Sequence, residues 1–197
     1  MNKLKHISLA RSIFSKKFSF AQAMILCLSL GLASLTHAES PLSNEKPDIF
    51  VTQYEASLWL LKMSARMEKF VKNDVTRLEI LRQVYIEAQK NKLDPNFVLS
   101  VMHVESRFNP QAISSAGAQG LMQVMPFWKK ELGPGRQENL RDIKTNIRYG
   151  CKILKIYMAQ EKGNPVRALA RYNGSTGRTW YPTLVLNAWK SNWIING

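Results

Sequence analysis

Apolar residues recur every three or four positions along much of the chain, which is the spacing of one face of an α-helix. Two stripes of this kind precede residue 90 and consist of Ala56, Trp59, Leu60, Met63, Met67 and Phe70, followed by Val75, Leu78, Leu81, Tyr85 and Ala88. Asp74 stands directly before the second stripe and is the expected N-cap of its helix. These stripes predict two amphipathic helices whose methionine and aromatic side chains belong to the core.

A third helix is predicted between Asp94 and Asn109. Asp94 is a favourable N-cap, and Pro95 suits the first helical position, where a backbone N–H has no partner within the helix. The dipeptide Asn109-Pro110 is a stop signal, because the residue before a proline disfavours the helical conformation.

Helical spacing continues to the end of the chain. Residues 127–141, which include Gly133-Pro134-Gly135, are expected to form a loop, followed by helices at about 142–161, at 165–172 and from Pro182 onward. The inward side chains expected in the last helix are Val185, Ala188, Trp189 and Trp193. No segment alternates apolar and polar residues over the length of a strand, so the pattern predicts a single, mainly α-helical domain.

The N-terminus has a different composition. Five Lys and Arg lie within residues 1–17, and an apolar run of 13 residues covers 23–35. Thr36-His37-Ala38 is an acceptable cleavage site, and the apolar run is too short to span a bilayer comfortably. Residues 1–38 are therefore interpreted as a cleaved signal peptide, with an uncleaved membrane anchor as the alternative. Residues 39–72 are expected to contain a tether and the first helix.

The chain is strongly basic, with 28 Lys and Arg against 14 Asp and Glu and a formal net charge of +14. Removing residues 1–38 takes away five basic and no acidic residues, which leaves +9. This charge suits an acidic partner and is compatible with weak association with an anionic membrane surface. The basic residues are scattered and no nucleic-acid-binding signature is present, so nucleic acid is not expected as a partner.

Cys151 and His103 are the only cysteine and histidine after residue 38. One cysteine cannot form an internal disulfide, and one Cys with one His is too small a set for a zinc site, so no metal or cofactor is expected. A thiol hydrolase built on these two residues is disfavoured, because Cys151 falls on the apolar face of a predicted helix. His103 is expected to be a surface or packing residue.

Glu105 is the main candidate for chemistry, since it lies on the same helical stripe as Val98, Val101 and Met102. A carboxylate on a core-facing stripe is costly to bury in its charged form, so its pKa is expected to rise. A carboxylic acid of this kind can act as a general acid at neutral pH. The alternative is that Glu105, close to the helix end, turns out to solvent.

Residues 114–120 are all small or polar and include two glycines, a composition that lets the backbone approach a ligand closely. Gln123 then stands among Leu121, Met122 and Val124, and it is a candidate for binding a hydroxyl or amide group.

Four short segments follow one another in the sequence: Glu105-Ser106, Gly120-Leu121-Met122-Gln123, Asn146-Ile147-Arg148-Tyr149-Gly150 and Ala170-Arg171-Tyr172-Asn173. Together they resemble the motifs of the lytic transglycosylase family. The resemblance implies a goose-lysozyme-like helical domain over residues 73–197 that cuts the glycan strands of bacterial peptidoglycan. It also implies a location in the periplasm or cell envelope.

The resemblance further implies that Glu105 acts alone, first as general acid and then as general base, so that the sugar closes to a 1,6-anhydro product without water. The composition agrees with this, because ordinary glycosidases need two carboxyl groups roughly 5–9.5 Å apart. None of the later acids stands in a motif that would place it opposite Glu105. These acids are Glu131, Glu138, Asp142 and Glu161.

By the same resemblance, the substrate-binding residues are Ser106, Met122, Gln123, Tyr172 and Asn173. Gln123 would bind a sugar, with Met122 as an apolar floor. Tyr172 would place its hydroxyl near Glu105 and help to set the protonation of that acid. Ser106 would bond to substrate or to the carboxylate, and Asn173 would orient substrate or the loop.

Asn146 is expected to be structural. Trp180 and Tyr181 could stack on sugar rings, but we expect them in the core. The sequence after Asn173 is Gly-Ser-Thr-Gly, whereas the family often has Ala-Gly-Pro-Gly, so the loop contacts near the cleavage point are expected to differ.

Two other functions stay open. A goose-type muramidase would share Glu105 and the fold but deliver water to the bond, and a second ordered carboxylate opposite Glu105 would favour it. A non-catalytic wall-binding module would keep the substrate-binding groove of the family but lose the surroundings that raise the pKa of Glu105.

Overall fold

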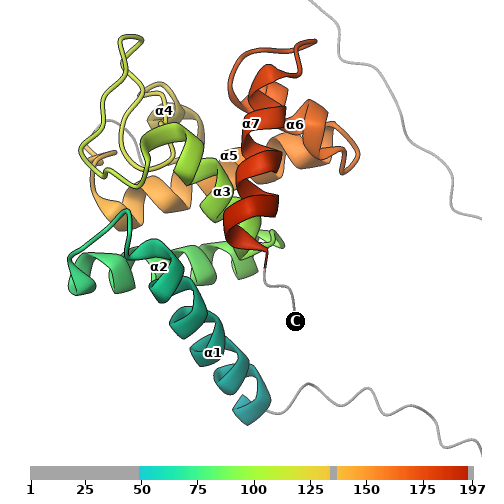
Figure 1. The fold of residues 1–197 in the computed structure, drawn as a ribbon. Helices are drawn as coiled ribbons and strands as arrows, with labels where there is room; N and C mark the ends of the chain where they lie inside the picture. Colours follow the sequence, from blue (N-terminus) through green and yellow to red (C-terminus); the bar gives the residue numbers. More distant parts are fainter. Residues whose placement is uncertain (1–48, 134–136, 195–197) are drawn as a thin grey trace, which may run out of the picture. The chain divides into compact units, whose positions relative to one another are not determined.

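The computed structural model describes residues 49–133 and 137–194, which form seven α-helices and one π-helical turn (Figure 1). They are α1 (Ile49–Met67), α2 (Asp74–Asn91), α3 (Pro95–Ser106), α4 (Trp128–Leu132), α5 (Ile143–Gln160), α6 (Pro165–Tyr172), α7 (Trp180–Ala188) and the π-helical turn Trp189–Trp193. Within the described ranges no strand forms, and the β-structure is limited to two isolated bridges, Ile113–Gln119 and Gln119–Val124. The predicted mainly α-helical fold is confirmed.

The predicted signal peptide and the first part of the tether lie outside the described residues, as does Pro134-Gly135 of the expected loop. Among the residues that are described, no helix is long and apolar enough to cross a membrane.

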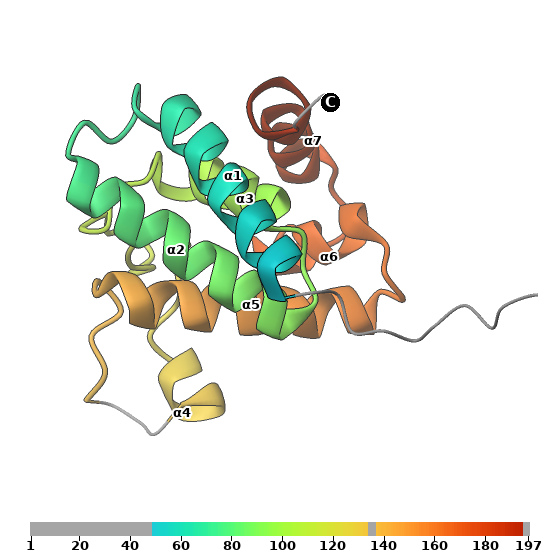
Figure 2. The same cartoon turned by 90° about the horizontal axis from the view of Figure 1, so that it is seen from below.

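Helix α3 is the central element of the domain. Residues 97–102 of this helix are all buried, because α2 packs against it on one side and α7 and the π-helical turn pack on the other. Figures 1 and 2 show this arrangement. In Figure 2, α5 runs across the lower part of the domain, and it contacts both α2 and α6. Because α3 is packed on both sides, the side chains at its end have a defined position in the domain.

The predicted core of α1 is confirmed, since Trp59, Met63 and Met67 are buried. The predicted stripe of α2 is partly wrong. Val75 is 76% exposed, and the buried apolar positions of α2 are Ile80, Leu81, Val84 and Ala88. Val75 lies on the opposite face of α2, since Arg77 in the same first turn is buried together with Ile80, Leu81 and Val84.

Helix starts follow from local sequence. Asp94, Asp142 and Asn164 each accept a backbone N–H as N-cap of α3, α5 and α6, and such caps contribute about 1 kcal/mol each. The cap of α2 is Asn73 rather than Asp74: its side chain accepts the N–H of Thr76 at 2.9 Å, while Asp74 is the first helical residue.

Two other boundaries differ from the expectation. The predicted loop at 127–141 contains the short helix α4. Helix α7 begins at Trp180, before Pro182, because proline is tolerated in the first turn, where its missing N–H needs no partner. The expected start of α6 at Pro165 and the burial of Trp193 are confirmed.

Candidate active site

Glu105 lies in the last turn of α3, where the helix ends because Arg107 and Phe108 adopt left-handed backbone conformations with φ of 51° and 64°. Its carboxyl group is mostly buried, and burial raises the pKa of Glu105 to about 7. The prediction of a raised pKa is confirmed, and the alternative that Glu105 turns fully out to solvent is wrong. At neutral pH the group can both donate and accept a proton.

The hydroxyl of Tyr181, at the start of α7, donates a hydrogen bond to Oε1 of Glu105 at 2.5 Å. This bond lowers the pKa of Glu105, but burial has the larger effect. Burial and the nearby carboxyl group in turn raise the pKa of Tyr181 well above its ordinary value, so this phenol stays a donor. The expected place of Tyr181 in the core is confirmed, since it is 2% exposed.

Tyr172 lies close enough to Glu105 to interact with it electrostatically, as expected, but among the described residues it is Tyr181 and not Tyr172 that affects the pKa of the acid. The hydroxyl of Tyr172 donates to the backbone carbonyl of Met122 at 2.8 Å, and Tyr181 holds the carboxyl group instead. Glu105 is still close enough to raise the pKa of Tyr172, after the larger effect of burial. Tyr172 therefore fixes the loop beside the acid rather than the acid itself.

The loop with Gly120 to Gln123 packs against the end of α3 and is held by Asn146, which is 1% exposed on α5. Asn146 accepts the N–H of Met122 at 2.7 Å and donates to the carbonyls of Gln119 at 2.8 Å and Leu140 at 2.6 Å. The expected structural role of Asn146 is confirmed. Gly120 has φ +74°, and a Cβ there would lie 2.5 Å from the carbonyl oxygen of Leu140, so only glycine fits.

Ser106 joins the same loop to α3. Its Oγ donates to the carbonyl of Leu121 at 2.7 Å and lies 3.3 Å from the carbonyl of Met102. No hydrogen bond from Ser106 to Glu105 occurs within the described residues, so of the two partners expected for Ser106, substrate or carboxylate, the carboxylate is excluded. Ser106 instead orients the loop relative to Glu105.

Gln123 is partly exposed and has a left-handed backbone with φ 47°. Its Nε2 donates to the carbonyls of Gly120 at 2.9 Å and Ala112 at 3.3 Å, which fixes the amide and leaves the side-chain oxygen as an acceptor. Asn173 is exposed at the C-cap of α6. Both side chains are therefore accessible to a ligand.

The interpretation of Met122 as an apolar floor under a sugar is wrong. Its side chain is 0% exposed and packs on α5, where a Cβ at Gly150 would lie 2.7 Å from the Cβ of Met122. Its backbone N–H and carbonyl bind Asn146 and Tyr172, so the residue turns its side chain inward.

The side chains of the other acidic residues after Glu105 either make contacts elsewhere in the domain or are exposed. Glu138 accepts bonds from Tyr149 and Arg148, and the Asp142 side chain caps α5. Glu131 is exposed in α4. No second carboxyl group contributes to the pKa of Glu105 in the described part of the chain.

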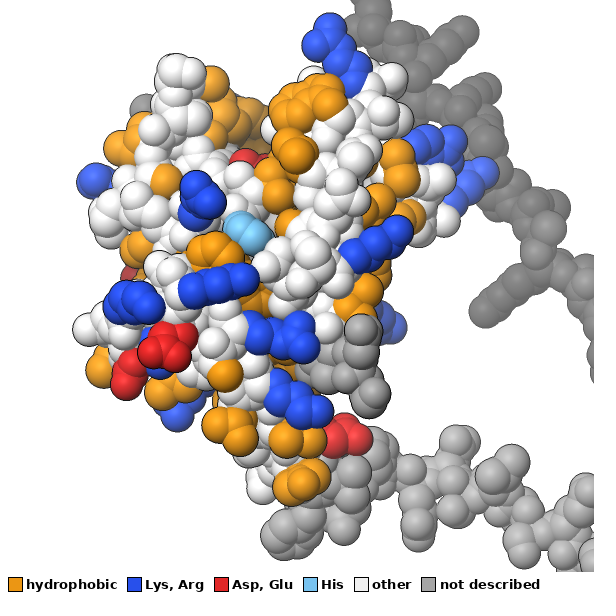
Figure 3. All heavy atoms as spheres, in the orientation of Figure 1, with side chains coloured by type: hydrophobic (Ala, Val, Ile, Leu, Met, Phe, Trp, Pro, Cys, Tyr) orange, Lys and Arg blue, Asp and Glu red, His pale blue; other side chains and the backbone are white. Residues whose placement is uncertain are grey.

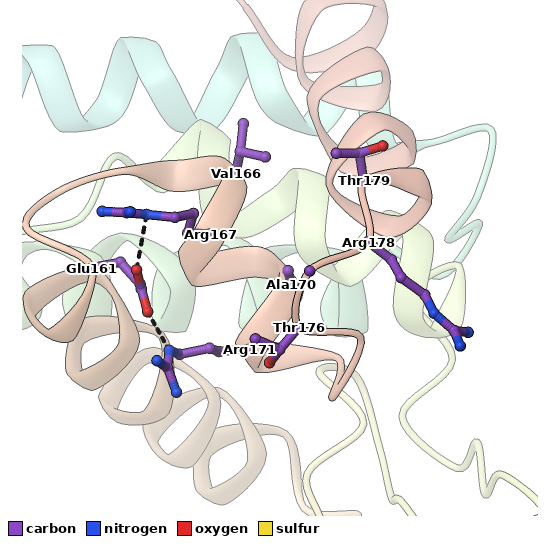
Figure 4. A pocket seen from close by; sticks show the side chains of 9 residues that line it. Glu161, Val166, Arg167, Ala170, Arg171, Thr176, Arg178 and Thr179 are labelled. Atoms are coloured by element: carbon purple, nitrogen blue, oxygen red, sulfur yellow. Dashed lines mark hydrogen bonds and ion pairs between the residues drawn. The ribbon is translucent and has the colours of Figure 1, made fainter.

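Glu161, at the end of α5, bridges Arg167 and Arg171 of α6 (Figure 4). This cluster forms one end of a cavity of about 390 Å³ that also includes Val166 and Ala170. Glu105 does not line this cavity. The carboxylate of Glu161 is therefore ion-paired with two arginines of α6 and lies in a cavity separate from Glu105.

Cys151 and His103 do not form a thiol site. Cys151 is 0% exposed in α5, and burial raises the pKa of its thiol. His103 packs against Phe70 and Phe108 and accepts a long hydrogen bond of 3.4 Å from the indole N–H of Trp193. Among the described residues, no group of three or more His, Cys, Asp or Glu could hold a metal ion.

The fold and site thus define a helical domain in which Glu105, a mostly buried acid at the end of a core helix, is held by a tyrosine. The model of a known family, the transglycosylase SLT domain, matches residues 83–184. This match covers more than half of the sequence, so the chain belongs to the transglycosylase SLT domain family.

Individual relatives agree. The chain is 40% identical over 91 residues to a transglycosylase of Enterobacteria phage PRD1, covering 46% of this chain and 32% of the relative. It is 54% identical over 83 residues to the membrane-bound lytic murein transglycosylase C of Haemophilus influenzae, covering 37% of this chain and 23% of the relative. The matches thus span less than a third of each relative's length.

Among solved structures, the soluble lytic transglycosylase of Escherichia coli superposes with a TM-score of 0.46 and 25% identity, covering 69% of this chain and 24% of that one.

Proposed function

We propose that this protein is a peptidoglycan lytic transglycosylase. It cleaves the β-1,4 bond between N-acetylmuramic acid and N-acetylglucosamine and leaves 1,6-anhydro-muramic acid ends. The observation that carries the proposal is Glu105 at the end of a core helix, whose pKa is raised to about 7 and is affected by no second carboxyl group among the described residues. Membership of the SLT family and the murein in the name of the Haemophilus relative support the choice of substrate.

In the first step, the protonated carboxyl group of Glu105 donates its proton to the glycosidic oxygen. The bond between this oxygen and C1 of the muramoyl residue breaks, and N-acetylglucosamine leaves with a free 4-hydroxyl group. The 2-acetamido group of the substrate stabilises the positive charge that develops at C1. A pKa near neutral pH suits the acid, because a proton donor is most effective when it is protonated at the working pH but gives up its proton readily.

In the second step, the Glu105 carboxylate removes the proton from the C6 hydroxyl of the same muramoyl residue. The C6 oxygen then closes on C1, and Glu105 is returned to its protonated form. No water is consumed, so no second carboxylate is needed to activate one. The C6 oxygen and C1 belong to the same sugar residue, so the attack is intramolecular. It therefore avoids much of the entropy loss of a reaction between two molecules.

The surrounding residues divide into two groups. The Gln123 amide oxygen and the exposed side chain of Asn173 are proposed to bind the sugars directly. Ser106 and Tyr172 donate to backbone carbonyls of the adjoining loop and are proposed to position it against the substrate. Tyr181 holds the Glu105 carboxyl group in one orientation for both proton transfers.

We also propose that the protein works in the periplasm or cell envelope after export through a signal peptide at residues 1–38. Residues 39–72 then supply the tether and α1, and residues 73–197 the catalytic domain. The mature charge of +9 supports binding to acidic peptidoglycan stems and weak association with an anionic membrane surface.

Mass analysis of products from purified sacculi tests the function. The expected products are muropeptides with 1,6-anhydro-muramic acid ends, one water lighter than the hydrolysed form. Reducing-end products would identify a muramidase instead. Binding of sacculi without any products would identify a wall-binding module. Glu105→Gln keeps the shape of the side chain but removes the proton donor, so it is expected to lower the rate of product release by several orders of magnitude.

A further inference from the structure

Trp180, the first residue of α7, is 52% exposed, so the expectation that it belongs to the core is wrong. Leu184, one helical turn later on the same face, is 50% exposed. The inward face of the same helix is formed by Tyr181, Pro182 and Val185, which are buried. Helix α7 therefore has two apolar faces, and the core accounts for only one of them.

The exposed indole is linked to the candidate acid through Tyr181. The rings of Trp180 and Tyr181 meet edge to face, with centroids 5.8 Å apart and an interplanar angle of 81°. The hydroxyl of Tyr181 is in turn bonded to Glu105 at 2.5 Å. Trp180 is thus one aromatic ring removed from the group that acts on the glycan, whereas the similarly exposed Tyr54 lies on α1 (70% exposed).

Single exposed apolar residues are common on protein surfaces, but an exposed apolar patch beside a catalytic group is typical of a ligand-binding groove. Figure 3 shows hydrophobic side chains gathered over the upper part of α7, at the edge of a hollow. The occupant must be flat and partly apolar to cover an indole. A pyranose ring with equatorial substituents presents such a face of C–H groups, and its hydroxyl and acetamido groups remain at the rim.

Tryptophan is well suited to this role. Its large ring is rigid and loses little conformational entropy when a ligand covers it. The indole of Trp180 is further held by its contact with Tyr181, so its orientation is set before the ligand arrives.

We propose that Trp180, with Leu184 beside it, is a sugar-stacking platform that holds an N-acetylhexosamine ring of the glycan next to the bond cleaved at Glu105. This inference rests on the proposed function, because the acid and its glycan substrate define the position of the platform. It adds a binding role for α7 beyond the four motifs, none of which includes Trp180.

The test compares Trp180→Ala, Trp180→Phe and Leu184→Ala with the full-length wild type on purified glycan strands. Tyr54→Ala is the matched control, since it also removes an exposed aromatic ring but from α1. Trp180→Ala is expected to raise KM about tenfold or more with kcat within about twofold, and Trp180→Phe to retain most of the affinity. Leu184→Ala is expected to have a smaller effect, and Tyr54→Ala none.

Two results would overturn the platform. One is an unchanged KM for Trp180→Ala in a folded protein. The other is a shifted pH profile of kcat with unchanged KM, because Trp180 would then act through Tyr181 on the acid instead of on the sugar.

A binding experiment separates this inference from the proposed function. Glu105→Gln and the double variant with Trp180→Phe are titrated with tetrameric N-acetylglucosamine, and tryptophan fluorescence is recorded. A ligand-induced change that is lost in the double variant supports the platform even if the wild type releases no products. An identical change in both proteins rejects the platform even if the wild type cleaves peptidoglycan.

Discussion

Replacing Glu105 by Gln is expected to stabilise the fold at high pH and not at low pH. The pKa of Glu105 is raised from 4.5 to about 7 by burial. Each pKa unit corresponds to about 1.4 kcal/mol, so ionised Glu105 lowers the free energy of unfolding by about 3 kcal/mol above pH 7. Below pH 4.5 the group is protonated in both folded and unfolded states, and the penalty is absent.

The sign follows from linkage. The folded state binds the Glu105 proton more tightly than the unfolded state, so stability is lost as pH rises from about 4.5 to about 7. Glutamine cannot ionise, and its amide oxygen can still accept the Tyr181 hydroxyl. The variant is therefore expected to match the wild type at pH 4 and to exceed it at pH 8.

Urea denaturation at pH 4, 6 and 8, followed by circular dichroism, measures the free energy of unfolding directly. Glu131→Gln, in the exposed part of α4, controls for the loss of one negative charge and is expected to show no such rise. A difference between Glu105→Gln and wild type that stays constant from pH 4 to 8 would refute the raised pKa and, with it, the main support for Glu105 as proton donor.

Three other substitutions test neighbouring contacts. Tyr181→Phe removes the hydrogen bond that lowers the pKa of Glu105. A charge-assisted bond contributes about 1.5–3 kcal/mol, so the pH above which activity falls is expected to rise by about 1–2 units. An unchanged pH profile of activity would contradict this. Asn146→Ala removes the partner of three backbone groups, two of them buried, and is expected to destabilise the fold by at least about 3 kcal/mol, measured by urea denaturation. A loss below about 1 kcal/mol would exclude the role of Asn146 in holding the loop. Gly150→Ala places a methyl group against Met122 and is expected to cost about 1–3 kcal/mol, seen as a lower Tm; an unchanged Tm would mean that Met122 can move aside.

Sequence periodicity was sufficient to predict most of the helices and the position of Glu105, although α4 and the start of α7 were missed. The stripe through Val98, Val101 and Met102 placed the acid at the edge of the core, and burial there raises its pKa as expected. Caps and prolines likewise marked the starts of α3 and α6, because these signals act within a few residues.

Contacts between distant residues could not be predicted in the same way. Tyr172 and Tyr181 both lie in helical segments near the site, and only the packing of α7 on α3 decides that Tyr181 contacts an acid 76 residues earlier. Met122 is turned inward by hydrogen bonds to its backbone, which the side-chain pattern does not encode. The exposure of Trp180 depends on which face of α7 meets the core, and its apolar character alone suggested the wrong face.

The position of Glu105 in the last turn of α3 has a further consequence. The carbonyl groups at a helix C-terminus together carry about half a negative charge, which disfavours an additional anion there. This effect is typically about 0.3–1 kcal/mol, so it is expected to add a smaller contribution to that of burial, and it comes from the backbone and not from any one side chain. Substitutions around Glu105 that change its burial or its bond to Tyr181 would move its pKa further, but this smaller backbone contribution would remain as long as α3 ends where it does.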